Sequence, residues 1–292
     1  MPILMRPLPG AGAEVDDVDL SSDLPLGDFE LLKSALACYG VLFFRGQTLS
    51  EDAHIALARR WGEININRFF AAHPDHPEIA LVLKEPHHKD NIGGGWHTDH
   101  SYDAEPALGS ILVARELPPE GGSTVFASMF RAYAALPDDL KRRLEGLRAV
   151  HSARHVFGAA AAAKRASDVR NGRIGNAAAA DVLEDVSHPV VIRHPVSGKP
   201  AIYVNPGFTT RIEGVSDEES QELLATLFEH CTQPQFLYEF HWTPGAVAVW
   251  DNRATWHFAR NDYHGYRRLM HRITLAGGPV RAAPIFQSHA LA

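Results

Sequence analysis

The chain has few of the features that mark secreted, membrane-spanning or nucleic-acid-binding proteins. It contains only two cysteines, Cys38 and Cys231, which we interpret as reduced thiols because no secretory signal precedes them. No run approaches the roughly 18 apolar residues of a membrane span. The 35 Asp and Glu residues outnumber the 28 Lys and Arg residues, and the net charge of −7 argues against binding to nucleic acid or to an anionic membrane. We therefore expect a cytoplasmic protein.

The sequence also lacks internal repeats and a convincing linker. Its 292 residues, 45% of them hydrophobic and 22% charged, can bury a core that needs no disulfide bonds. We expect one domain over residues 1–292. The strongest shift in composition lies at 158–185, where two alanine-rich runs flank polar residues and glycines. This segment fits either a surface helix with a linker or a mobile lid over a site.

Short apolar runs separated by turn residues predict mostly strands. The expected strands are 41–44, 78–83, 108–114, 123–127, 189–194, 201–204, 236–241, 246–250 and 270–275. The expected helices are 28–39, 51–61, 136–147 and 217–230, and Ser50 and Ser216 are candidate N-caps. Many short strands with few helices are typical of a sandwich or barrel, so we predict a mainly β fold with helical decoration.

Seventeen histidines justify a search for metal ligands. His97 and Asp99 are two residues apart, and such residues face the same side of an extended segment. With His257 they would form the two-histidine, one-carboxylate triad of non-haem Fe(II) oxygenases, which leaves positions open for a cosubstrate and dioxygen. The pair alone is a weak signal, because His87, His88 and His100 compete for the role. By strand alternation, we expect the His100 side chain to point away from the face of Asp99.

Two arginines follow His257 at a spacing that places them on one face of a strand. Arg268 and Arg272 would share this face with Met270. A guanidinium can bind the far carboxylate of a 2-oxo acid through two parallel hydrogen bonds. Two inward-facing arginines are costly unless anions bind them. The alternative is a basic strand end exposed to solvent.

Five segments of the chain carry a family pattern: Trp96–Asp99, Gly121–Thr124, Val204–Arg211, Trp250–Arg253 and Arg267–Arg272. In order and spacing they resemble the taurine dioxygenase family, which also contains the 2,4-dichlorophenoxyacetate and aryloxypropionate dioxygenases. The similarity extends from about Leu20 to Gly278. It implies a double-stranded β-helix (jelly roll), Fe(II) as cofactor, 2-oxoglutarate and O2 as cosubstrates, and a homo-oligomer, either a dimer or a tetramer.

The resemblance also implies roles for individual residues. These are His97, Asp99 and His257 for iron, Thr124 and Arg268 for 2-oxoglutarate, Arg272 for the anionic group of the substrate, and Phe157 and Phe208 for the walls of its pocket.

Other positions depart from the taurine enzymes. Asn67 and Phe70 stand where those enzymes carry a histidine and a tyrosine that hold the sulfonate end, and Gly93 replaces an asparagine. The substrate pocket should therefore be roomier and less polar, and should favour a longer or aromatic anion over taurine.

We predict an Fe(II)- and 2-oxoglutarate-dependent dioxygenase that hydroxylates a small organic anion next to a heteroatom and releases succinate and CO2. The anion would be a sulfonate, a sulfate ester or a carboxylate such as an aryloxyalkanoate. A plain taurine dioxygenase is the alternative. A zinc hydrolase using the same triad, which Arg268 disfavours, and a non-catalytic jelly-roll binding protein are more remote alternatives.

Overall fold

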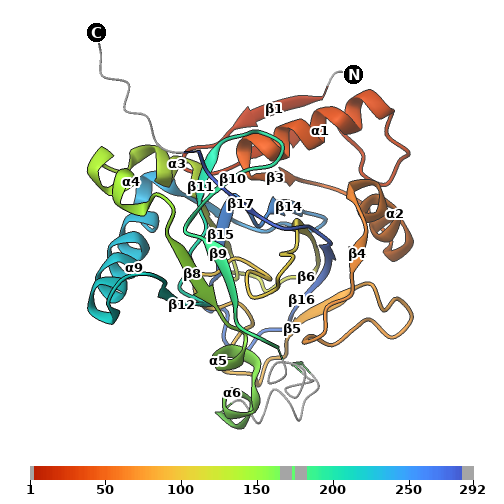
Figure 1. The fold of residues 1–292 in the computed structure, drawn as a ribbon. Helices are drawn as coiled ribbons and strands as arrows, with labels where there is room; N and C mark the ends of the chain where they lie inside the picture. The colour runs from red at the N-terminus through yellow and green to blue at the C-terminus, as the bar shows by residue number, and fades with distance from the viewer. Residues whose placement is uncertain (1–2, 165–172, 175–182, 285–292) are drawn as a thin grey trace.

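The structure is a computed structural model that describes residues 3–164, 173–174 and 183–284 (Figure 1). Its largest sheet has eight strands in the order β1, β2, β3, β14, β6, β16, β4, and β5 also pairs with β16. These strands are β1 (Leu4–Pro7), β2 (Ala13–Asp16), β3 (Val41–Phe44), β4 (Ile64–Asn65), β5 (Ala80–Lys84), β6 (Gly109–Glu116), β14 (Val247–Asp251) and β16 (Arg268–Leu275). The neighbours β3, β14, β6 and β16 come from distant parts of the chain, so the sheet gathers these parts into one layer.

A smaller sheet faces the central strands of the large one. It contains β13 (Leu237–Phe240), β7 (Thr124–Ser128) and β15 (Thr255–Ala259), with β7 in the middle. Phe126 and Phe240 of this sheet pack with Trp250 and Met270 of the large sheet in one buried cluster. The two facing sheets form the expected mainly β arrangement.

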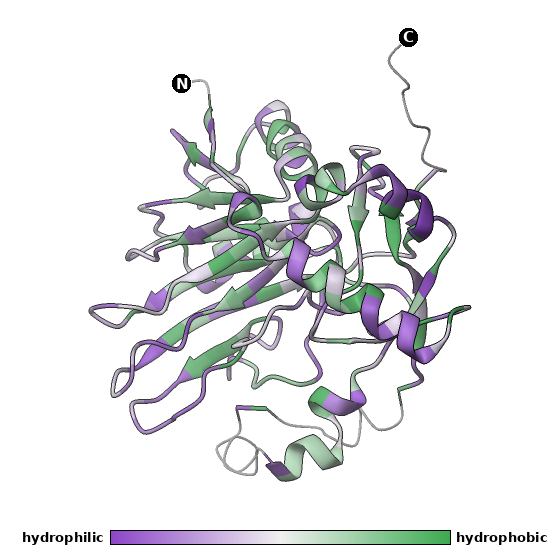
Figure 2. Ribbon diagram, turned by 90° about the vertical axis from the view of Figure 1, so that its left-hand side faces the viewer, coloured by the Kyte–Doolittle hydropathy of each residue, from purple (hydrophilic) through white to green (hydrophobic). Residues whose placement is uncertain are grey.

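The central strands are buried on both faces, which explains their nearly continuous apolar sequences. On β6, Ile111 and Val113 belong to the cluster that packs under the N-terminal helices. The alternate residues Leu112 and Ala114 belong to the cluster between the two sheets. Figure 2 shows hydrophobic residues concentrated on these strands. A residue on the inner face of β6 or β16 therefore points into the space between the sheets.

Two helices cover the outer face of the large sheet (Figure 1). They are α1 (Leu26–Tyr39) and α2 (Glu51–Trp61), close to the predicted ranges 28–39 and 51–61. Gly40, in the left-handed region with φ 78°, ends α1. The Ser50 side chain accepts a hydrogen bond from the N–H of Ala53 and caps α2 as predicted.

The remaining elements lie on the other side of the small sheet and around its edges. They are α3 (Met129–Ala135), α4 (Asp138–Leu144), α5 (Arg154–Phe157), α6 (Ala159–Lys164), α9 (Asp217–Cys231), the 3₁₀ turn η1 (Pro234–Phe236), and two three-stranded sheets formed by β12 (Thr209–Ile212), β8 (Arg148–His151) and β9 (Val186–Pro189) and by β11 (Pro200–Ile202), β10 (Val191–Arg193) and β17 (Arg281–Ala282). The predicted helix 136–147 is wrong at both ends, because only α4, from Asp138 to Leu144, lies within that range. α3 was not predicted and ends before it, at Ala135. Pro137 separates the two helices, because it cannot continue a helix and instead precedes a new one.

Most of the predicted lid or linker at 158–185 lies outside the described residues. The described part contains α6 and the pair 173–174. Ile174 forms an isolated antiparallel bridge with Phe70, which places this short piece beside the loop that precedes β5.

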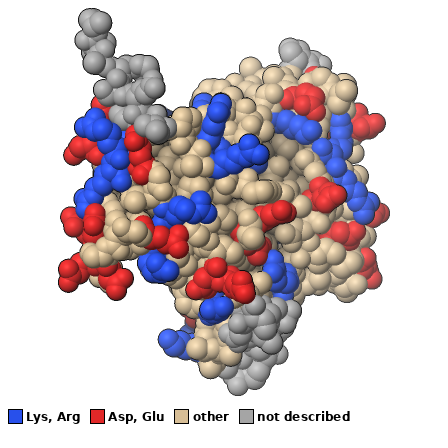
Figure 3. All heavy atoms as spheres, in the orientation of Figure 1, with Lys and Arg blue, Asp and Glu red and all other residues tan. Residues whose placement is uncertain are grey.

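Acidic and basic side chains are interspersed over the face shown in Figure 3, without a broad region of one sign. No helix among the described residues is long and apolar enough to cross a membrane.

Candidate active site

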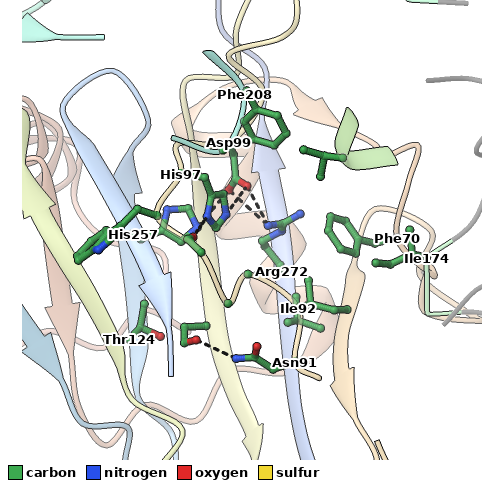
Figure 4. A pocket seen from close by; sticks show the side chains of 18 of the residues that line it. Phe70, Asn91, Ile92, His97, Asp99, Thr124, Ile174, Phe208, His257 and Arg272 are labelled. Atoms are coloured by element: carbon green, nitrogen blue, oxygen red, sulfur yellow. Dashed lines mark hydrogen bonds and ion pairs between the residues drawn. The ribbon is translucent and has the colours of Figure 1, made fainter. Parts of the chain in front are cut away.

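Three potential metal ligands from two distant segments meet between the two sheets (Figure 4). His97 and Asp99 lie in the loop before β6, and His257 lies on β15. His97 and His257 form an isolated antiparallel bridge, with backbone hydrogen bonds of 3.2 and 2.8 Å. Asp99 Oδ1 lies 3.7 Å from His97 Nε2, and Asp99 Oδ2 lies 3.9 Å from His257 Nε2. One potential ligand atom from each residue lies within 4.8 Å of the other two, which is close enough for one ion.

The protonation of the two imidazoles suits metal binding. His97 Nδ1 lies 2.7 Å from the carbonyl oxygen of Gly95, so an Nδ1–H donates there and the Nε2 lone pair is free. Burial, with the neighbouring His97, lowers the pKa of His257 to about 3, which keeps this ring neutral. Two imidazoles and one carboxylate fit Fe(II) in its facial-triad geometry.

A buried guanidinium holds the carboxylate of Asp99. Arg272 Nη1 lies 3.3 Å from both oxygens of Asp99, and the Ser110 hydroxyl donates to Oδ2 at 3.4 Å. Burial by itself would raise the pKa of Asp99, but the positive charge of Arg272, above all, opposes burial, and that pKa is held well below its usual range. Asp99 is therefore an anionic candidate ligand. Nε and Nη2 of Arg272 have no hydrogen-bond partner in the described part of the chain.

The other predicted arginine lies on the same face of β16. Arg268 is 4% exposed, and its Nε and Nη2 also have no partner within the residues described. Its guanidinium carbon lies 5.9 Å from the ring centroids of both Trp242 and Tyr263. A buried guanidinium with unpaired donors is costly until an anion binds it. The geometry therefore provides a carboxylate site at this end of the strand.

Thr124 lies on β7 and lines the same cavity as Arg268. Its Oγ1 accepts a hydrogen bond from the Trp242 indole N–H at 3.0 Å. With the oxygen occupied as an acceptor, the hydroxyl proton is free to be donated to a bound carboxylate.

The triad and both arginines line one cavity of about 660 Å³. The end of the cavity that holds Arg272 is aromatic, with walls formed by Phe70, Phe157 and Phe208. Phe157 packs against Phe70 edge to face at 6.2 Å and stacks on Phe208 at 6.1 Å. The Arg272 guanidinium lies 4.7 Å from the centroid of the Phe70 ring, so it is the cation at this apolar end.

Asn67 lines the cavity, but most of its amide is already engaged. Its Oδ1 accepts hydrogen bonds from the backbone N–H groups of Phe69 and Phe70 at 2.9 and 3.0 Å. Its Nδ2 faces Nε2 of His100 at 3.4 Å. Asn67 therefore holds the loop that carries Phe70, and at most part of its amino group faces a substrate.

The prediction that His100 points away from the site is wrong. His100 lies in a turn with φ 59°, which strand alternation does not describe, and its side chain lines the same cavity as Asp99. Its Nδ1 lies 2.8 Å from Oδ2 of Asp103, whose other oxygen accepts a hydrogen bond from Arg68 at 2.8 Å. With Nδ1 donating to a carboxylate, Nε2 is the acceptor that faces Asn67.

Sequence reasoning missed three aromatic residues in or beside this cavity. Tyr102 lines it and lies beside Phe208, whereas Trp242 and Tyr263 do not line it but flank Arg268. The position of Tyr102, three residues after Asp99 in the same loop, could have indicated that it lies near the cavity. Trp242, which follows β13, reaches the site only because β13 pairs with the distant strand β7, whereas Tyr263 lies in the loop directly before β16.

A second group with metal-ligand chemistry lies outside the cavity. Ligand atoms of Glu51, His73 and His271 lie within 4.8 Å of one another. Arg115 already provides the cation here, because its Nε lies 3.1 Å from Nδ1 of His271 and its Nη2 lies 3.5 Å from Oε1 of Glu51. An ion at this place would have to displace the arginine, so the cluster is an arginine-centred polar network.

Comparison with known proteins agrees with this geometry. The family model described as "Taurine catabolism dioxygenase TauD, TfdA family" matches residues 5–274. The chain belongs to this family. The predicted family, and a dioxygenase as the class of enzyme, are thereby confirmed.

Individual relatives cover nearly the whole chain. A sulfate ester dioxygenase of Pseudomonas putida, named as dependent on alpha-ketoglutarate (2-oxoglutarate), is 35% identical over 91% of this chain and 86% of its own. A 2,4-dichlorophenoxyacetate dioxygenase of Burkholderia sp. (strain RASC) is 33% identical over 94% of both chains.

Solved structures share the fold. A taurine dioxygenase from Burkholderia xenovorans aligns with a TM-score of 0.79 at 33% identity, over 95% of this chain and 92% of its own. The structure of AAD-2 in complex with Mn(II) and N-oxalylglycine aligns with a TM-score of 0.75 at 29% identity, over 97% of this chain and all of its own (100%). The predicted jelly roll is confirmed.

Proposed function

We propose that the protein is an Fe(II)- and 2-oxoglutarate-dependent dioxygenase that hydroxylates a small organic anion next to a heteroatom. One observation carries this proposal. Two buried arginines on one strand, Arg268 and Arg272, each present unpaired donors to the cavity that also contains the His97–Asp99–His257 group. A metal hydrolase has no need of two such anion sites.

Each group of residues has a separate task in this proposal. His97, Asp99 and His257 hold the iron, which supplies the oxidative chemistry together with O2 and 2-oxoglutarate. Arg268 and the Thr124 hydroxyl bind the far carboxylate of 2-oxoglutarate and fix its orientation. Arg272 and the aromatic walls hold the substrate so that one carbon lies near the metal.

The walls favour a substrate larger than taurine. Phe70, Phe157 and Phe208 offer apolar surface, and the Asn67 oxygen is committed to the backbone. Relatives of this chain are named for sulfate esters and for 2,4-dichlorophenoxyacetate, which is an aromatic anion. We therefore assign a sulfate ester, sulfonate or aryloxyalkanoate to this chain, with taurine as the alternative substrate.

The test is oxygen uptake and succinate release with Fe(II), 2-oxoglutarate and a panel of alkyl sulfates, sulfonates, aryloxyalkanoates and taurine. The expected result is succinate formed in proportion to one of the bulkier anions. The variant His257→Ala is the control for metal-dependent turnover. Hydrolysis that proceeds without 2-oxoglutarate would instead indicate a zinc hydrolase. Ligand binding without turnover would indicate a jelly-roll binding protein.

Two further expectations follow from the family resemblance and the composition. They are a homo-oligomer, which light scattering in solution checks, and a cytoplasmic location, which cell fractionation checks.

A further inference from the structure

Tyr102 forms part of the aromatic end of the cavity. It is 4% exposed, and its ring packs edge to face on Phe208, with centroids 4.7 Å apart. Its ring centroid lies 6.0 Å from that of Phe157, and it lines the same cavity as Arg272. These ring contacts would be served equally well by a phenylalanine. The hydroxyl oxygen is the part that packing does not explain.

That hydroxyl makes no hydrogen bond among residues 3–164, 173–174 and 183–284, and its oxygen is not one of the fully buried unpaired atoms, so it remains accessible. Buried tyrosine hydroxyls usually find a partner. Tyr203, by contrast, has an unpaired hydroxyl sealed in the core, away from the residues that line the cavity. Because the Tyr102 ring lines the cavity, a molecule bound there can supply the partner.

The charges around Tyr102 define what kind of partner fits. Burial, with the carboxylates of Asp103 and Asp99, raises the pKa of Tyr102 well above its usual value, so the hydroxyl keeps its proton. Arg272 lies over the Phe70 ring, which packs on the same Phe157 ring that Tyr102 contacts, and its Nε and Nη2 are unpaired in the described structure. An O–H donor and a guanidinium with free N–H groups therefore lie at the same end of the cavity. Such a pair of donors is typical of a site that binds an anionic oxygen.

We propose that the Tyr102 hydroxyl donates a hydrogen bond to the anionic group of the substrate, beside Arg272, and is a specificity-determining residue of this enzyme. This inference rests on the proposed function, because it takes the occupant of the cavity to be an organic anion. The hydroxyl would add a directed donor to the charge of Arg272. It thereby favours head groups with several oxygens, such as sulfate, sulfonate or carboxylate.

The test removes one oxygen atom and retains the ring. Tyr102→Phe leaves the packing on Phe208 and Phe157 in place. Hexyl sulfate and phenoxyacetate are titrated calorimetrically into the anaerobic Fe(II)–2-oxoglutarate complex of the wild type and the variant. The expected result is a roughly tenfold or larger rise in Kd for an anion that the wild type binds, as for the loss of one hydrogen bond to a charged group. The Kd of 2-oxoglutarate should not change.

Tyr203→Phe is the control, since it removes an unpaired tyrosine hydroxyl that is sealed in the core and does not line the cavity. It should leave both anion affinities unchanged. A Tyr102→Phe variant that binds every anion within twofold of the wild type overturns the proposal. So does a wild type that binds neither anion. In that last case, 2-oxoglutarate-dependent oxygen consumption without added substrate still tests the dioxygenase itself.

Discussion

Arg272 Nη1 lies 3.3 Å from both carboxylate oxygens of Asp99, so one guanidinium serves both the candidate metal ligand and the substrate cavity. Its remaining donors are free for an anion. In the proposed function, substrate binding and metal binding would therefore be linked through a single side chain. The carboxylate needs this charge because burial opposes its ionisation.

Replacing Arg272 should consequently weaken two kinds of binding. In Arg272→Met, the Fe(II) affinity should fall about 10- to 100-fold, as for other groups that orient metal ligands. Binding of the organic anion should fall at least as far. Metal titration followed by anion titration measures both. An unchanged metal affinity would show that Asp99 does not depend on the arginine.

The three proposed metal ligands should behave alike. His97→Ala, Asp99→Ala and His257→Ala should each bind Fe(II) weakly and lose turnover, with the far-ultraviolet circular dichroism spectrum retained. Normal activity in any one of these variants would show that the replaced residue is not a metal ligand. His100→Ala is the contrast, since it should retain the metal but raise the KM for the organic substrate several-fold by releasing Asn67.

Arg268→Ala should raise the KM for 2-oxoglutarate strongly, because truncating one partner of a buried charge pair costs roughly 2–5 kcal/mol. Arg268→Lys should restore only part of the affinity, since an ammonium cannot form two parallel hydrogen bonds. The neighbour Arg267 is a suitable control. It pairs with Glu85 and Glu116 at the surface, and Arg267→Ala should leave this KM nearly unchanged. If Arg268→Ala impaired only the organic substrate, the roles of Arg268 and Arg272 would be reversed.

The wild type should turn over hexyl sulfate or phenoxyacetate with a kcat/KM roughly tenfold or more above that for taurine, whose polar groups would be poorly paired here. Asn67→His together with Phe70→Tyr should shift this ratio toward taurine. Phe70→Tyr alone tests the new hydroxyl while the hydrogen bonds from Asn67 to the loop remain. If the wild type prefers taurine over every bulkier anion, the protein is instead a plain taurine dioxygenase.

Stability should fall in mild acid because of buried neutral histidines. Burial, with Arg115 nearby, lowers the pKa of His54 in α2 to about 3 in the folded protein. Between the ordinary value of about 6.5 and this value, the unfolded chain binds a proton that the folded chain does not, so the free energy of unfolding falls as the pH falls. Over this pH window, one such group changes the free energy of unfolding by about 1.4 kcal/mol per pH unit.

His54→Leu should reduce that slope by about this amount in denaturant titrations at pH 7, 6 and 5. The exposed His264 provides the control variant His264→Leu. An unaltered slope in His54→Leu would show that another group governs the loss of stability in acid.

Structural features that follow a fixed period along the chain can be predicted from the sequence alone. Arg268 and Arg272 were placed on one inward face because alternation holds along β16. The alternation rule failed at His100, where a left-handed residue turns the chain. The Asn67 oxygen accepts from the amides two and three residues along the chain, a local turn that asparagine favours, so the sequence could have indicated that this amide is engaged. Trp242 reaches Arg268 only because distant strands pair.

The spacing of the two arginines along β16 has a consequence for regioselectivity. Four residues of extended chain separate their Cα atoms by about 13 Å. The far end of the cosubstrate and the charged head of the substrate would thus be anchored at a fixed separation, with the metal ligands near the head. In a homologous series of anions, the carbon that is oxidised should keep a constant distance from the head as the tail lengthens. Longer members would extend further among the phenylalanines without moving the point of attack.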